Sequence, residues 1–199
     1  DGGMTAAGHL PDDIARFAAL DGPTGAEDAV ADALVTSLAP LADRVGRDAL
    51  GNVIAYRGSH GAGAADALGG VDGLDDRPRL LIAAPMDEPS LIVARIDPGG
   101  FLRFRPIGPL AGVDVRAWLG QPVTVHGRRP LAGVIGTRPP HVLDVAVRDV
   151  TPDIDVLFVD VGLCEADVQA AVAIGDAVTL RRVPVRMAGG RLTGKAVAR

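Results

Sequence analysis

The stretch RLLIAAPMDEP, residues 79–89, separates two different textures of the sequence. Residues 80–84 form a continuous apolar run, which is typical of a strand buried on both faces in an α/β fold. Two adjacent carboxylates, Asp87 and Glu88, follow this run. Because α/β folds place their ligands at the carboxyl ends of such strands, this is the expected functional position. The alternative interpretation is that both are ordinary turn residues at the end of a strand.

Helical patterns precede this stretch. A helix is expected over residues 11–20, where apolar residues recur on one face. A second helix is expected to run to about Leu38, and Thr24 with Glu27 has the spacing of a capping box at its start. A strand over residues 52–57 follows it. This alternation of helix and strand indicates an α/β layer.

From Ser90 onward the sequence consists mostly of short β segments. The expected strands are residues 91–96, 100–105, 122–126, 131–135, 156–161 and 177–183, with one helix at 165–173. We therefore predict an α/β fold that carries an inserted, β-rich, barrel-like domain. Residues 1–89 with 190–199 would form the α/β unit, and residues 90–189 the insert. The glycine-rich residues 58–76 are expected to form a flexible surface loop.

Charge, hydropathy and cysteine content exclude several classes of protein. The net charge of −5 provides no basic field for nucleic acid. No apolar run approaches the roughly 18 residues of a membrane span. The first residues lack the basic and apolar regions of a secretory signal. A single cysteine, Cys164, excludes a disulfide framework and a cysteine-based zinc site, and it suits a reducing cytoplasm.

Eight short motifs occur in order along nearly the whole chain. They are DGPTGAE (21–27), DALGNVIA (48–55), LIAAPMDE (81–88), IDPGGFLRF (96–104), GVIGTRPPH (133–141), DVLFVDVG (155–162), GDAVT (175–179) and GKA (194–196). Together they resemble the TET-type metallo-aminopeptidases, the glutamyl aminopeptidase family, some members of which are labelled endoglucanases.

The resemblance implies an enzyme that removes N-terminal residues from peptides with two divalent metal ions, zinc or cobalt. Such ions polarise the scissile carbonyl and activate a water molecule. It also implies that the inserted β-rich domain, residues 90–189, mediates homo-oligomerisation.

The chain departs from the family motif at the metal site. Pro85 occupies the position of a metal-binding histidine, and Ala198 that of the aspartate that bridges the two ions. Asp87 matches the family carboxylate that orients the histidine, so here it has no histidine to orient. The general base and the remaining ligands would lie beyond Arg199. We therefore expect no bound metal and no activity from this chain alone.

Other candidate side chains offer no replacement. The four histidines, His9, His60, His126 and His141, are interpreted as surface or hydrogen-bonded residues. Cys164 begins a predicted helix, where a thiolate is stabilised, but no accompanying histidine or asparagine pattern marks it as a nucleophile. We interpret it as an ordinary thiol.

Three functions remain open from the sequence. The chain is an inactive aminopeptidase relative that pairs with a missing C-terminal half, a non-catalytic assembly module that pairs with itself or with complete homologues, or a small β-barrel binding domain with a chance resemblance. The first two predict peptides as the family substrate and a homo-oligomer in the cytoplasm, without nucleic-acid or membrane partners.

Overall fold

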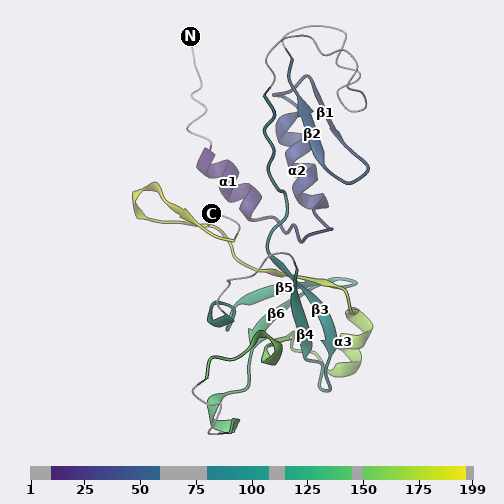
Figure 1. The fold of residues 1–199 in the computed structure, drawn as a ribbon, viewed down its shortest axis with the longest axis vertical. Coiled ribbons are helices and arrows are strands. Elements are labelled where there is room, and N and C mark those ends of the chain that lie inside the picture. The colour runs from purple at the N-terminus through teal and green to yellow at the C-terminus, as the bar shows by residue number, and fades with distance from the viewer. Residues whose placement is uncertain (1–9, 59–79, 108–114, 145–149, 196–199) are drawn as a thin grey trace.

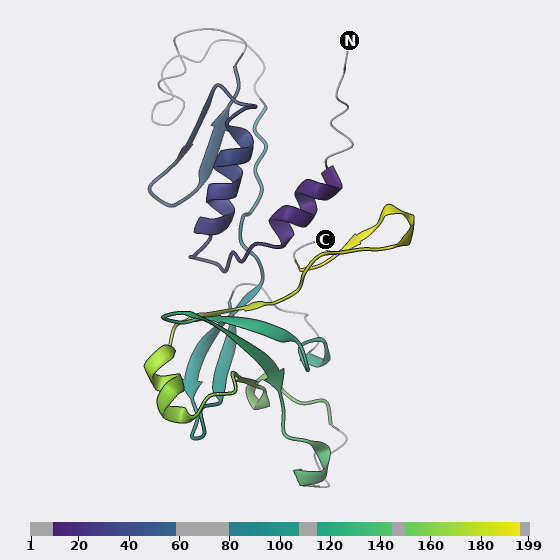
Figure 2. The same ribbon diagram turned by 180° about the vertical axis from the view of Figure 1, so that it is seen from behind.

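The computed structural model describes residues 10–58, 80–107, 115–144 and 150–195. The fold is mixed α/β. Two helices and a two-stranded sheet lie at one end of the molecule, and a closed six-stranded barrel lies at the other (Figures 1 and 2). In the described part of the chain, no helix is both long enough and apolar enough to cross a membrane. The predicted loop at 58–76 falls, from residue 59 onward, outside the described residues.

The N-terminal elements largely match the prediction. They are α1 (Leu10–Ala18), α2 (Asp28–Leu38), β1 (Arg44–Arg47) and β2 (Val53–Tyr56). Both helices and the strand at 52–57 were expected. Strand β1 was not, because its four residues show no clear apolar alternation. β1 and β2 pair as an antiparallel hairpin in register Arg47↔Val53, and Val30 and Ala31 are the buried residues of α2.

The predicted capping box is wrong. Helix α2 begins one residue after Glu27, which is itself the N-cap and accepts a hydrogen bond from the Gly25 backbone N–H at 2.7 Å. The Thr24 hydroxyl instead donates to Asp87 Oδ2 at 2.9 Å. Thr24 thus binds a residue 63 positions further along the chain, and such a long-range contact cannot be predicted from local spacing.

The predicted buried strand at 80–84 is also wrong. This segment forms no β-ladder with any described residue, and its side chains face solvent. Leu80, Leu81 and Ile82 are 86%, 89% and 83% exposed. A continuous apolar run indicates burial only where other elements cover both faces, and the described residues supply no such cover.

A closed antiparallel barrel forms the second half of the fold. Its strands are β3 (Ser90–Ile96), β4 (Leu102–Ile107), β5 (Pro122–His126), β6 (Pro130–Gly136), β7 (Phe158–Asp160) and β8 (Ala177–Leu180), in the order β3-β4-β7-β6-β5-β8. All six were expected from their apolar alternation; β5 matches the predicted range, and the other five have ends shifted by a few residues. Closure leaves the barrel without a free sheet edge.

The inward-facing side chains of the strands fill the barrel. Leu91, Leu102 and Val159 are fully buried, and Trp118 is 5% exposed. Helix α3 (Glu165–Ala171) adds Val168 to this core and lies beside β3 (Figure 1). The barrel therefore has its own hydrophobic core.

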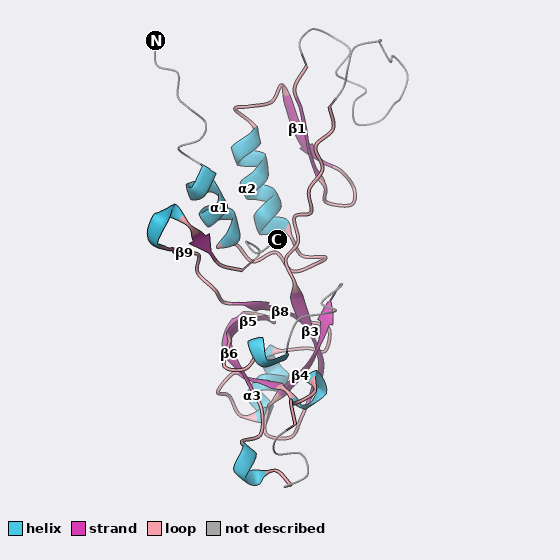
Figure 3. Ribbon diagram, turned by 60° about the vertical axis from the view of Figure 1, so that its left-hand side comes forward, coloured by secondary structure: helices cyan, strands magenta, loops and turns pink. Residues whose placement is uncertain are grey.

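A short hairpin follows the barrel. It consists of β9 (Val185–Arg186) and β10 (Leu192–Thr193). Arg186 forms an ion pair with Asp12 of α1, so the hairpin lies next to that helix (Figure 3). Short 3-10 turns occur at Val115–Ala117, Pro140–Val142, Ile154–Val156 and Ala188–Gly190.

Candidate functional site

A tight turn after β1 forms one wall of the candidate site. The Asp48 carboxylate accepts hydrogen bonds from the backbone N–H groups of Leu50 and Asn52, both at 2.9 Å, and from the Asn52 side-chain amide at 2.7 Å. Gly51 adopts φ +88°, a conformation that side chains with a Cβ rarely accept. The Asn52 side chain, followed by the turn's backbone N–H groups, lowers the Asp48 pKa below 3.8.

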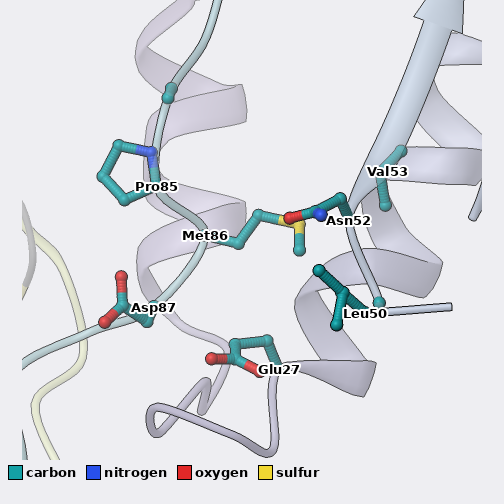
Figure 4. A pocket seen from close by; sticks show the side chains of 9 residues that line it. Glu27, Leu50, Asn52, Val53, Pro85, Met86 and Asp87 are labelled. Atoms are coloured by element: carbon teal, nitrogen blue, oxygen red, sulfur yellow. The ribbon is translucent and has the colours of Figure 1, made fainter. Parts of the chain in front are cut away.

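A pocket of about 260 Å³ lies between this turn and the segment after residue 83 (Figure 4). Its lining comes from the start of α2, the β1–β2 turn and the end of the apolar run: Glu27, Leu50, Gly51, Asn52, Val53, Ala84, Pro85, Met86 and Asp87. The Met86 side chain extends toward Asn52 (Figure 4). The Asp87 side of this pocket was expected from the sequence, whereas the opposite wall was not.

Asp87 is held at the pocket by its hydrogen bond from Thr24. The neighbouring Pro85 carries no side-chain donor, so Asp87 orients no metal ligand at that position. Ala198, the second substituted family position, lies outside the described residues. Within residues 10–58, 80–107, 115–144 and 150–195, no three histidine, cysteine or carboxylate side chains are grouped to hold a metal ion. The described residues therefore do not fit a metal pair.

Glu88 does not line this pocket and is buried. Its Oε1 accepts hydrogen bonds from the Gly22 backbone N–H and from Lys195 Nζ, both at 3.0 Å. The Glu88 and Lys195 side chains are only 6% and 5% exposed. Glu88 was expected at the functional position, but its partner Lys195 was not predicted. The available signal was that Lys195 is the only lysine in the chain.

The remaining candidates lie apart from the pocket. His126, at the end of β5, has Nε2 2.8 Å from Thr179 Oγ1, and His141 is exposed in a 3-10 turn. His9 and His60 lie outside the described residues. Cys164 is exposed at the N-cap of α3 and donates from Sγ to Asp167 Oδ2 at 3.2 Å.

The buried position of Glu88 predicts a specific pH dependence. Burial raises the Glu88 pKa above 4.5, partly offset by the Gly22 N–H and by Lys195. The folded chain then binds the proton more tightly than the unfolded chain, so this group lowers the free energy of unfolding as the pH rises through 4.5 to the raised pKa. Glu88→Gln removes this contribution but keeps an oxygen for Gly22. We expect urea unfolding at several pH values to show the stability of Glu88→Gln, relative to the original chain, improving as the pH rises.

Glu165→Gln is the matched control, because it removes a carboxylate from the start of α3 and leaves the Glu88 site intact. If the two substitutions show the same pH profile relative to the original chain, the assignment to Glu88 is wrong.

Comparison with known proteins agrees with the motifs. The profile of the M42 glutamyl aminopeptidase family matches residues 68–197. SgcX of Escherichia coli strain K12 is 35% identical over 177 residues, which are 87% of this chain and 43% of that protein.

Two solved structures have the same fold. The aminopeptidase APDkam598 from the archaeon Desulfurococcus kamchatkensis has a TM-score of 0.75 and 33% identity, over 95% of this chain and 48% of its own. A TET aminopeptidase from a marine sediment Thaumarchaeota archaeon has a TM-score of 0.74 and 28% identity, over 89% of this chain and 46% of its own.

These matches confirm the predicted resemblance and overturn the third alternative, a barrel with a chance likeness. The chain spans about half the length of the relatives it matches. A family profile that covers most of the chain, together with the ordered motifs and the shared fold, shows that the chain belongs to the M42 glutamyl aminopeptidase family.

Proposed function

We propose that this 199-residue chain is an M42 family member that does not hydrolyse peptides by itself. The observation that carries the proposal is Pro85, which lines the candidate pocket where the family motif has a metal-binding histidine. A two-metal mechanism requires several ligands that converge on ions about 3.5–4 Å apart. Pro85 has no donor atom, and the other substituted position is an alanine, Ala198.

The resemblance defines what a complete site would do. The substrate class is peptides with a free N-terminus, and the ions are zinc or cobalt, which suit histidine and carboxylate ligands. Asp87 would orient a histidine at position 85 through a hydrogen bond to its ring. In this chain the Thr24 hydroxyl donates a hydrogen bond to the Asp87 carboxylate instead.

The expected result is that the purified chain does not cleave aminoacyl-p-nitroanilides of glutamate, leucine or lysine with added cobalt or zinc. Loss of a single group that orients a ligand costs about 10–100-fold in affinity or activity, and here two direct ligand positions are replaced. Restoring Pro85→His and Ala198→Asp together is expected to give no turnover, because about half the length of the relatives has no counterpart in this chain.

A complete relative assayed in parallel is the positive control. Metal-dependent turnover by the purified chain that disappears in Asp87→Asn would contradict the proposal.

A second candidate function is an assembly module, which pairs with itself or with complete homologues through residues 90–189. Its support is that the barrel strands are closed and fully packed while the family metal positions are replaced. On β6 the apolar side chain of Val134 is 43% exposed, and Phe158 of β7 packs edge-on against Phe101 with ring centroids 4.8 Å apart.

We propose that residues 90–189 act as this inserted oligomerisation domain, with residues 1–89 and 190–199 as a partial catalytic domain. The exposed apolar run at 80–84 would pack against the half of the family fold that this chain does not cover. The single exposed thiol, Cys164, supports a cytoplasmic location.

We expect the chain to form a homo-oligomer that Val134→Asp weakens, because a charge on an apolar contact surface must be desolvated for the contact to form. Size-exclusion chromatography with light scattering measures the mass. Ile82→Asp is the matched control: it places the same charge on the exposed apolar run and should leave the barrel-mediated oligomer in place while reducing non-specific association. An oligomer that Ile82→Asp abolishes and Val134→Asp leaves unchanged would move the interface to the apolar run.

A further inference from the structure

A partly buried polar cluster lies where the barrel meets the N-terminal part of the fold. It consists of five side chains from five separate segments, here named the junction cluster: Asp21, Glu88, His126, Thr179 and Lys195. Asp21 follows α1, Glu88 precedes β3, and Lys195 follows β10. His126 and Thr179 come from the barrel strands β5 and β8.

Lys195 connects the two carboxylates of the cluster. Its ammonium donates to Glu88 Oε1 at 3.0 Å and also to Asp21 Oδ1. The backbone strengthens this arrangement, since the Glu88 N–H donates to the Gly22 carbonyl at 2.9 Å. Removal of the ammonium would leave two carboxylates facing each other, one of them buried, which is strongly unfavourable.

Asp21 connects this ion pair to the barrel. The Thr179 hydroxyl donates to Asp21 Oδ1 at 3.2 Å and lies 2.8 Å from His126 Nε2. His126 Nε2 is also 3.9 Å from Asp21 Oδ2. One carboxylate thus accepts hydrogen bonds both from Lys195 and from the barrel surface.

The neighbouring hydroxyl of Ser90 suggests that this junction can open. Ser90 is 1% exposed, and its Oγ is the one fully buried side-chain polar atom without a hydrogen-bond partner in the described residues. The register Leu91↔Val178, continued by one residue, places Ser90 beside Thr179. Opening would give this hydroxyl a water partner. The junction is polar, and polar contacts between domains commonly permit relative movement.

We propose that the junction cluster is a reversible lock between the barrel and the N-terminal helices, held closed by Lys195. When the ammonium is lost or unpaired, the junction opens while the barrel stays folded. This inference is independent of whether the chain hydrolyses peptides, because it concerns contacts that lie outside the candidate pocket.

The composition provides a separate reporter for each part. Lys195 is the only lysine, and Trp118, in the barrel core, is the only tryptophan. Acetylation by an N-hydroxysuccinimide ester, located by peptide mass spectrometry, distinguishes Lys195 from the terminal amine and measures exposure of the junction. Trp118 fluorescence reports whether the barrel is intact.

We expect Lys195 in the native chain to react at least about tenfold more slowly than in the chain unfolded by guanidinium, because hydrogen bonds to charged groups contribute a factor of this order. Asp21→Asn should accelerate its acetylation, again about tenfold, with unchanged Trp118 emission. The backbone amides of Gly22 and Glu88 should exchange hydrogen faster in the same variant. A change in the basicity of the Lys195 amine would alter acetylation alone, so faster exchange identifies opening of the junction. Asp13→Asn on the surface of α1 is the matched control and should change neither reading.

Lys195→Met provides a second test that does not depend on acetylation. We expect faster exchange at Gly22 and Glu88 and a larger radius of gyration by X-ray scattering, with native Trp118 emission. Three results would each overturn the proposal: native Lys195 reacting as fast as in the unfolded chain, exchange at Gly22 and Glu88 unchanged in both variants, or Lys195→Met unfolding the barrel together with the junction.

Discussion

We expect Leu102→Ala to lower the free energy of unfolding of the barrel by about 2–5 kcal/mol, the range for a buried leucine that leaves a cavity. Leu102 is fully buried in β4, where it pairs with Val159 of β7. These strands belong to a closed barrel, so the surrounding residues have little freedom to collapse into the space. Urea unfolding followed by Trp118 fluorescence measures the effect, because Trp118 belongs to the same core.

Leu80→Ala is the matched control, with the same chemical change on a side chain that is 86% exposed. We expect it to change the stability by less than about 0.5 kcal/mol, as is usual for surface positions. Equal losses at Leu80 and Leu102 would mean that residues 80–84 are buried in solution, contrary to the structure.

The second large effect is expected at Gly100, in the turn between β3 and β4. Gly100 has φ +87°, and a Cβ there would lie 2.9 Å from the Leu163 carbonyl oxygen and 3.2 Å from the Glu165 backbone nitrogen. Gly100→Ala therefore combines left-handed backbone strain with a clash against backbone that cannot rotate away. We expect a loss of about 2–5 kcal/mol from these two sources together.

Gly162→Ala separates the two contributions, because Gly162 has φ +69° and nothing within 4 Å of an added Cβ. It should cost only about 1–2 kcal/mol, the strain alone. Both variants are measured by the same urea titration. If Gly100→Ala is no worse than Gly162→Ala, the close approach of the β3–β4 turn to the start of α3 does not contribute to stability.

The barrel and the N-terminal part of the fold differ in how much of their apolar surface the described residues bury. The barrel closes on itself and buries its own core, so each strand has both neighbours. The N-terminal part has a two-stranded sheet and an apolar run that no described strand covers. This difference agrees with the finding that the chain spans about half of its relatives.

The sequence predicted the barrel well because each of its strands carries its own signal. β5, for example, alternates Val123 and Val125 inward with Thr124 and His126 outward, and the prediction of 122–126 is confirmed without a shift. The Asp48-to-Asn52 turn is also stabilised locally, because its hydrogen bonds join residues at most four positions apart. Local spacing is sufficient where the stabilising contacts are local.

The prediction failed where a residue's environment depends on distant segments. Residues 80–84 have the composition of a buried strand, yet hydrophobicity alone does not say whether a second layer covers them. Thr24 has the spacing of a capping residue, but its hydroxyl binds Asp87, which lies 63 residues away.

The sequence by itself determined the family, the positions of the barrel strands along the chain and the loss of a donor at Pro85, because each follows from residue identity or from short-range periodicity. Only the tertiary structure decided that Glu88 pairs with Lys195 in a buried contact, and that Lys195 also binds Asp21. Lys195 lies 107 positions from Glu88 and 174 positions from Asp21. A carboxylate that loses its water on folding is tolerated only when a cation lies against it, so the burial of Glu88 requires Lys195.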